Sequence, residues 1–116
     1  MKTLNAKLAD YFEVYGWDLV CNHTQGLEWW ADEIWQLKSR WSPEGAEVFI
    51  TFLVDPILKR NRKKAQGVWA VGCTASYPRT REHAEREGVL HLSASKSEVE
   101  KFVELVNRFR TSRLHT

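Results

Sequence analysis

The sequence holds little that would indicate a disulfide framework, a zinc ribbon or a membrane span. It has two cysteines, Cys21 and Cys73, and no CxxC pair. A disulfide-rich scaffold or a zinc ribbon would need more cysteines at closer spacing. No run approaches the roughly 18 uninterrupted apolar residues of a membrane helix, and residues 1–12 lack the apolar core of a secretory signal. We therefore expect a cytoplasmic protein without membrane contact, whose two thiols are free.

An excess of charge is also missing. The chain has 17 basic and 15 acidic side chains, a formal net charge of +2. This balance excludes a protein that binds polyanions over its whole surface, although a local basic patch can still steer a ligand. The length of 116 residues predicts a single domain over 1–116. The hydrophobic fraction of 43% is typical of a folded chain and argues against disorder.

Both ends of the chain carry a helical pattern. Leu4, Leu8, Phe12 and Tyr15 are spaced to lie along one face of a helix, which Gly16 is expected to end. Near the C-terminus, Ser95 and Glu98 form the sequence pattern of a capping box. An apolar stripe at helical spacing follows over residues 99–109. These patterns predict one helix at each end.

The middle of the chain is predicted to form strands. Alternating or uniformly apolar stretches predict strands over 17–21, 33–41, 46–54, 67–74 and 89–92. Residues 27–32 fit either a short strand or a helical turn, and 76–88 fit a charged surface loop with one helical turn. The link between 46–54 and 67–74 carries no helical stripe for a crossover, so antiparallel pairing is expected. The predicted class is α+β: an antiparallel four- to five-stranded sheet, with the N-terminal and C-terminal helices packed on one face.

A basic segment between two predicted strands is the first candidate site. Its side chains are Lys59, Arg60, Arg62, Lys63 and Lys64. They could contact phosphates while Trp69 stacks on a base. A charged loop that keeps two apolar strands soluble explains the same residues. Because the whole chain is nearly neutral and lacks the aromatic pattern of an RNA-binding sheet, the nucleic-acid interpretation is not favoured.

The predicted strand 46–54 is apolar on both faces, and this suggests an interface. Two terminal helices can cover one face of the sheet. The other face, with Phe49, Leu53, Trp69 and Val71, would then need a partner. A second copy in a two-fold dimer is the simplest one, and another protein is the alternative. This argument predicts a homo-oligomer that forms through an apolar sheet face.

A pocket near His23, Trp29 and Trp30 is the third candidate site. Tryptophans are frequent at binding surfaces, while Trp35 and Cys73 fit the core better, the cysteine as an inert thiol. Cys21 and His23 are two residues apart and could form a thiol–imidazole pair. No phosphate loop, nucleophile elbow or metal motif is present, so we predict no catalytic residue, metal or cofactor.

Taken together, the sequence favours a small non-catalytic binding or assembly domain that associates with itself. Two alternatives stay open: a nucleic-acid-binding module that uses residues 59–64, and a small-ligand carrier or enzyme with a pocket near His23.

Overall fold

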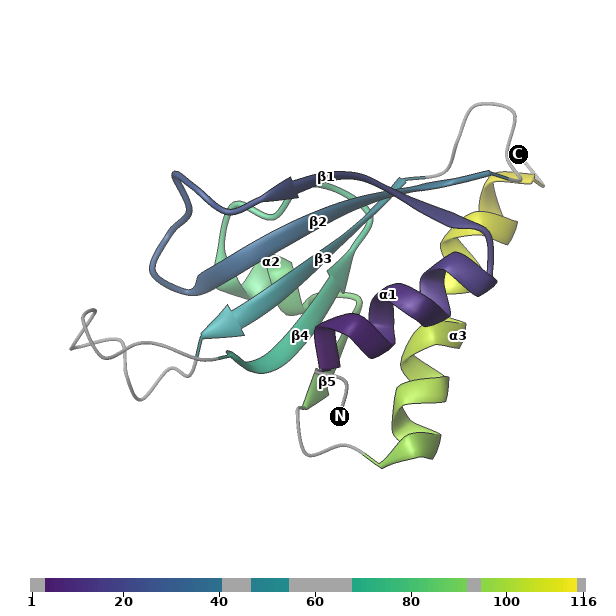
Figure 1. Cartoon of the computed structure of the whole chain (residues 1–116). Helices are drawn as coiled ribbons and strands as arrows, with labels where there is room; N and C mark the ends of the chain where they lie inside the picture. The colour runs from purple at the N-terminus through teal and green to yellow at the C-terminus, as the bar shows by residue number, and fades with distance from the viewer. Residues whose placement is uncertain (1–3, 41–46, 55–67, 92–94, 115–116) are drawn as a thin grey trace.

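The computed structural model describes residues 4–40, 47–54, 68–91 and 95–114 (Figure 1). Its elements in chain order are α1 (Leu4–Val14), β1 (Trp17–His23), β2 (Ala31–Ser39), β3 (Glu47–Val54), β4 (Val68–Thr74), α2 (Arg81–Glu85), β5 (Gly88–His91) and α3 (Lys96–Leu114). The boundaries of the strands and of the N-terminal helix agree with the prediction to within about two residues. α3 continues to Leu114, beyond the predicted stripe over 99–109, and Trp41, the predicted last residue of the second strand, lies outside the described residues. Residues 29–30, left open by the sequence, form a turn.

The strands form a simple meander in which neighbours in sequence are neighbours in space. The order is β1-β2-β3-β4-β5, and each neighbouring pair is antiparallel. Trp35 of β2 lies opposite Ile50 of β3, which lies opposite Cys73 of β4. Cross-strand neighbours point to the same face of a sheet, so these three side chains share one face. The predicted antiparallel α+β sheet is confirmed.

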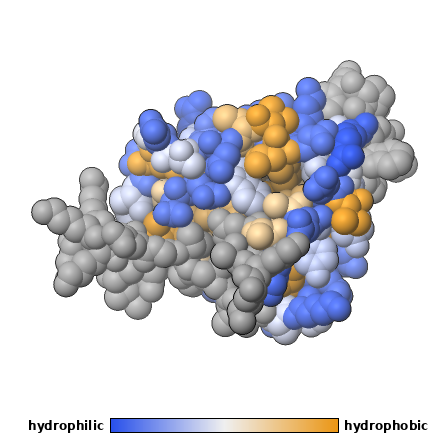
Figure 2. All heavy atoms as spheres, viewed as in Figure 1, coloured by the Kyte–Doolittle hydropathy of each residue, from blue (hydrophilic) through white to orange (hydrophobic). Residues whose placement is uncertain are grey.

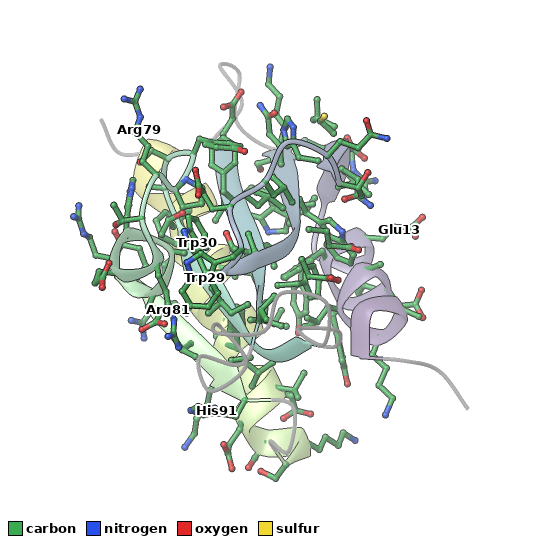
Figure 3. The ribbon with its side chains drawn as sticks, turned by 90° about the vertical axis from the view of Figure 1, so that its left-hand side faces the viewer. Glu13, Trp29, Trp30, Arg79, Arg81 and His91 are labelled. Atoms are coloured by element: carbon green, nitrogen blue, oxygen red, sulfur yellow. The ribbon has the colours of Figure 1, made fainter. Side chains whose placement is uncertain are left out.

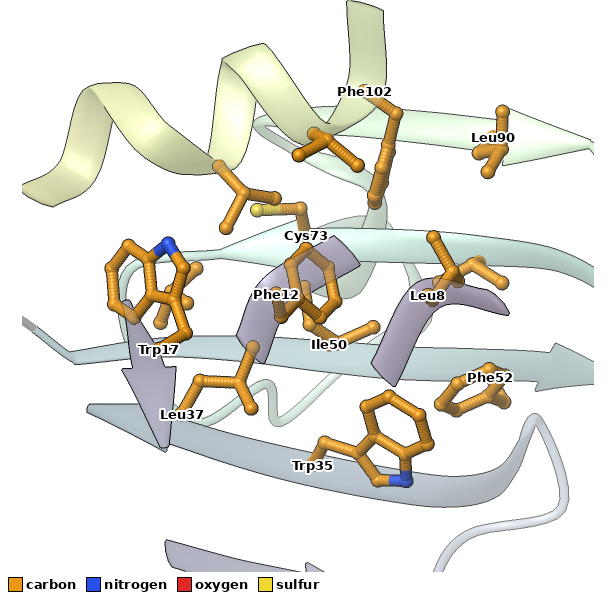
Figure 4. Packing of buried hydrophobic residues seen from close by; sticks show 14 residues of the cluster. Leu8, Phe12, Trp17, Trp35, Leu37, Ile50, Phe52, Cys73, Leu90 and Phe102 are labelled. Atoms are coloured by element: carbon orange, nitrogen blue, oxygen red, sulfur yellow. The ribbon is translucent and has the colours of Figure 1, made fainter. Parts of the chain in front are cut away.

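The terminal helices α1 and α3 cover this face and enclose the larger core (Figure 4). α1 contributes Leu8 and Phe12, and α3 contributes Phe102, Val103 and Val106. The other buried members of the cluster come from the strands: Trp17, Trp35, Leu37, Val48, Ile50, Phe52, Val71, Cys73 and Leu90. The prediction that both terminal helices pack on one face is confirmed, as is the core position of Trp35.

Local signals fix the ends of these two helices. Gly16 follows α1 with a φ of 88°, in the left-handed region, and its N–H donates to the Glu13 carbonyl oxygen at 3.1 Å. Glycine adopts this conformation without the steric cost of a side chain. At the start of α3, the Glu98 N–H donates to Ser95 Oγ at 3.4 Å. Both features follow from the sequence pattern.

The opposite face of the sheet is covered by α2 and by the connection between β1 and β2. A second buried cluster lies there, made of Trp30, Ala31, Ile34, Phe49, Leu53, Ala70 and Ala84. The sequence analysis assumed that the face around Phe49 and Leu53 is uncovered, and this assumption was wrong. The sequence did not reveal that residues 76–85 fold back over the sheet and bury this face within one chain. Val71 belongs to the other face, beneath the terminal helices.

Among the described helices, none is both long and apolar enough to span a membrane.

Candidate functional site

Two connections on the α2 side of the sheet come together over the second cluster. One joins β1 to β2 and carries Trp29 and Trp30; the other joins β4 to α2 and carries Tyr77 and Arg79. Figure 3 shows Trp29 and Trp30 lying between Arg79 and Arg81 on the same side of the molecule. A hollow surface lies between the two connections.

The hollow has two parts. The first has a volume of about 400 Å³ and is lined by Gly26, Leu27, Glu28, Trp30, Ala31, Ile34, Tyr77, Pro78 and Arg79. The second has a volume of about 380 Å³ and is lined by Glu28, Trp29, Trp30, Arg79, Thr80, Arg81 and Glu82. Glu28, Trp30 and Arg79 line both parts, so the two adjoin each other. We call this surface the tryptophan groove.

A tight turn positions the two tryptophans. The Ala31 N–H donates to the Glu28 carbonyl oxygen at 3.0 Å, and the Trp30 carbonyl oxygen accepts from the Val54 N–H at 2.9 Å. The first bond closes the turn, and the second ties it to the end of β3. Trp30 is 7% exposed and belongs to the second cluster, whereas Trp29 packs against that cluster and remains partly exposed. Trp30 therefore forms the floor of the groove and Trp29 forms part of its wall.

The opposite wall is held by hydrogen bonds around His83. The backbone N–H of His83 donates to Thr80 Oγ1 at 3.0 Å, which caps α2. Its imidazole lies 3.1 Å from Ser76 Oγ through Nε2, and its Nδ1 accepts from the Arg79 N–H at 3.4 Å. These contacts fix the path of the chain from Ser76 to α2. The wall that presents Arg79 is thus an ordered part of the fold.

Both signs of charge line the groove. The Arg81 guanidinium pairs with Glu85 at 2.9 Å. In the described part of the chain, no ion pair engages the side chains of Arg79, Glu28 or Glu82. A guanidinium and two carboxylates are thus available to a ligand beside an aromatic floor. A polyanion would meet both carboxylates, so the charge pattern suits a ligand of mixed charge.

His23 and Cys21 lie on the same face, at the β1 end of it. The His23 ring packs edge-to-face on Tyr77, with the ring centroids 5.5 Å apart. Cys21 Sγ lies 3.8 Å from His23 Nδ1, so the fold does bring the predicted pair into contact. Over the described residues, no group of three or more His, Cys, Asp or Glu side chains is placed to hold a metal. Within the described residues, no third side chain contacts the pair in the way that orients a catalytic imidazole.

Cys73 is a buried thiol in the larger core, as expected. Burial raises its pKa far above the ordinary value, and the negative charge of Glu87 adds to the effect. The nucleophilic thiolate is therefore suppressed. Cys73 is a packing residue.

The other predicted site residues have different outcomes. Phe49 and Leu53 are buried in the second cluster, with exposed fractions of 7% and 0%. Trp69 lies in β4, but its side chain is outside the described part, and so is the basic segment. The members of that segment are Lys59, Arg60, Arg62, Lys63 and Lys64.

Sequence reasoning missed Tyr77, Arg79, Arg81 and Glu82 as groove residues. The stretch 76–88 looked like a charged surface loop, because five helical residues show no apolar stripe. The available signal was Gly72 in the middle of a predicted strand. Such a glycine often marks the close approach of another part of the backbone, and here that part is α2.

No family model matches the chain, and neither a curated protein nor a solved structure is significantly similar to it. What the groove can bind is therefore inferred from its own chemistry.

Proposed function

We propose that this chain is a non-catalytic binding domain and that the tryptophan groove receives an extended peptide segment of a partner protein. The observation that carries the proposal is the shared lining of the two hollows by Trp30, Glu28 and Arg79. An aromatic floor with hollows on both sides offers places for successive side chains of one segment. Trp is also among the residues that contribute most to protein interfaces.

The mixed charge of the groove selects a peptide over a nucleic acid. Arg79 offers a planar donor to a carboxylate, and Glu28 and Glu82 accept from a lysine or arginine. A peptide can carry both groups, while a phosphate backbone carries only negative charge. A second candidate, nucleic-acid binding through residues 59–64, draws its support from the sequence alone. The two free thiols, Cys21 and Cys73, suit the reducing cytoplasm that we propose as the compartment.

The small-ligand alternative uses the same surface. Each hollow falls within the usual range for small-molecule sites, about 300–1,000 Å³. However, the residues that line the hollows lack a base held in place by a third group, so binding without chemistry is the simpler proposal.

A selection from a displayed library of random peptides tests the proposal. The purified chain is expected to enrich sequences that combine an aromatic or aliphatic residue with an acidic and a basic one. Synthetic versions should bind the wild type and lose at least about tenfold in affinity with Arg79→Glu or Trp29→Ala, a change of about 1.4 kcal/mol. Arg86→Glu is the matched control, because Arg86 is exposed just after α2 and lines neither hollow.

Two results would contradict the proposal. One is a selection without any enriched sequence. The other is enriched peptides that bind Arg79→Glu and Trp29→Ala as well as the wild type. A parallel titration with mixed single-stranded DNA and RNA at low and moderate salt separates the nucleic-acid candidate, whose binding should fall steeply with salt.

A further inference from the structure

β1 lies at one edge of the sheet. In the described part of the chain it hydrogen-bonds only to β2 (Figure 1). An exposed strand edge is a template for another strand, and proteins block it with charged side chains, above all lysine, with proline or with a β-bulge. β1 has the sequence WDLVCNH, which contains no lysine, arginine or proline; its one carboxylate, Asp18, is paired with Arg40, and its bulge lies at Val20.

Exposed apolar side chains gather at this same edge. Of the six large hydrophobic side chains that are exposed in the described residues, four belong to residues 14–20: Val14, Tyr15, Leu19 and Val20. Leu19 is 50% exposed and Val20 is 55% exposed. Figure 2 shows hydrophobic surface over β1. Leu19 also lines a cavity of about 190 Å³ between α1 and the sheet, together with Phe12 and Trp17.

A bulge at Val20 decides which side chains of β1 share a face. The pairing with β2 shifts between Leu19 and Cys21. Leu19 and Asn22 lie opposite Leu37 and Trp35, so they point to the side of the terminal helices. Cys21 and His23 lie opposite Gln36 and Ile34, and Asp18 lies opposite Lys38, so these three point to the α2 side.

We propose that β1 pairs antiparallel with β1 of a second copy of this chain around a two-fold axis between Val20 and Cys21. This register joins the two five-stranded sheets into one and places Leu19 opposite Asn22 of the second copy. It also places Asp18 opposite His23 of the second copy. The Leu19–Asn22 and Asp18–His23 pairs then each keep their side chains on the same face, as sheet pairing requires.

Hydrogen bonding and the absence of like-charge pairs favour a second copy as the occupant. Each Asp18 carboxylate faces an imidazole, and no like charges lie opposite each other. Arg40 Nε contacts Asp18 Oδ1 at 3.1 Å, which leaves Oδ2 for the second copy. The two-fold axis forms this pair twice, and the exposed Leu19 and Val20 of both copies are covered together. The proposal is independent of the tryptophan groove, which lies over the second cluster.

Sedimentation velocity on the full chain over a concentration series tests the pairing. The wild type is expected to be a dimer whose dissociation constant rises at least about tenfold in Val20→Lys, because an edge lysine opposes strand pairing. Val89→Lys is the matched control: Val89 is an exposed valine on β5, the other edge of the sheet. Circular dichroism checks that both variants fold. A wild type that is monomeric throughout, or equal dissociation constants for the two variants, would overturn the proposal.

Disulfide cross-linking tests the register. Asp18→Cys and His23→Cys are made separately, each together with Cys21→Ser. Oxidising a mixture of the two proteins is expected to give a mixed dimer, because directly opposite residues have Cβ atoms about 4.5–5.5 Å apart. Each protein alone should give little cross-linking, since the introduced cysteines of its two copies would lie several residues apart along the paired strands. Equal cross-linking in the mixture and in the separate samples would overturn this register.

Discussion

A Cβ atom on Gly72 would lie 2.2 Å from the carbonyl oxygen of Ala84. Gly72 is in β4, and Ala84 is the buried residue of α2. The missing side chain lets the backbone of α2 rest directly on the sheet. This close approach lets α2 cover the second cluster. It also positions the side of the tryptophan groove that contains Thr80, Arg81 and Glu82.

Gly72→Ala is expected to destabilise the fold by about 1–3 kcal/mol, because backbone rather than a flexible side chain must move. Chemical denaturation measures this loss, and peptide binding to the groove should weaken with it. Gly88→Ala is the matched control. A Cβ on Gly88 would also lie 2.2 Å from its neighbour, but that neighbour is Cδ2 of Leu105, which can rotate away. Equal losses for both variants would show that α2 does not depend on this close approach.

Thr51 is a buried threonine whose hydroxyl has no hydrogen-bond partner among the described residues. Thr74 is equally buried, but its Oγ1 donates to the Ser76 carbonyl oxygen at 2.8 Å. Thr51→Val should therefore be neutral or stabilising, since it removes a buried polar group without breaking a bond. Thr74→Val should cost about 0.5–1.5 kcal/mol. Free energies of unfolding from urea titrations compare the two, and a larger loss in Thr51→Val would contradict the assignment.

The sequence predicts best those elements whose pattern is local. The stripes of α1 and α3 face the sheet as their spacing requires, and Gly16 and Ser95 lie at helix ends where their chemistry places them. The strands also follow from alternation and apolar runs. In each case the residues that decide the element lie within it, so neighbouring residues carry the whole signal.

The coverage of the second face could not be predicted in this way. Phe49 and Leu53 look like an exposed apolar face if residues 76–88 are a surface loop. Whether this face is covered depends on contacts between residues that are distant in sequence, above all Gly72 with Ala84 and Tyr77 with His23. Five residues of α2 are too few to show a periodic stripe. Trp29 and Trp30 were recognised as candidates, but the arginine and the carboxylates beside them come together only through this tertiary contact.

Trp17 links β1 to the last helix by a single side-chain hydrogen bond. Its Nε1–H donates to Asn107 Oδ1 of α3 at 3.0 Å, and Trp17 itself is 2% exposed. Asn107→Ala leaves this buried donor unpaired and should cost about 1–3 kcal/mol. In a Trp17→Phe background, where the donor is already absent, the same change should cost less. A double-mutant cycle by thermal or urea denaturation measures the difference, and additive losses would show that the bond contributes nothing.

The buried thiol of Cys73 predicts how stability changes at alkaline pH. Burial raises the pKa of the folded thiol from its ordinary value of 9.0. The unfolded chain therefore loses this proton first, and deprotonation favours the unfolded state. The stabilising contribution is complete below about pH 9 and is lost as the pH rises above the unfolded pKa, by up to about 1.4 kcal/mol per pH unit.

Cys73→Ala isolates this contribution from the lysines and tyrosines that titrate in the same range. The variant is expected to be less stable at neutral pH, because it leaves a small cavity. Its stability should then fall less steeply than that of the wild type between about pH 9 and 10.5, so that the two curves of unfolding free energy converge. Parallel curves for Cys73→Ala and the wild type would show that the thiol is not held protonated by the core.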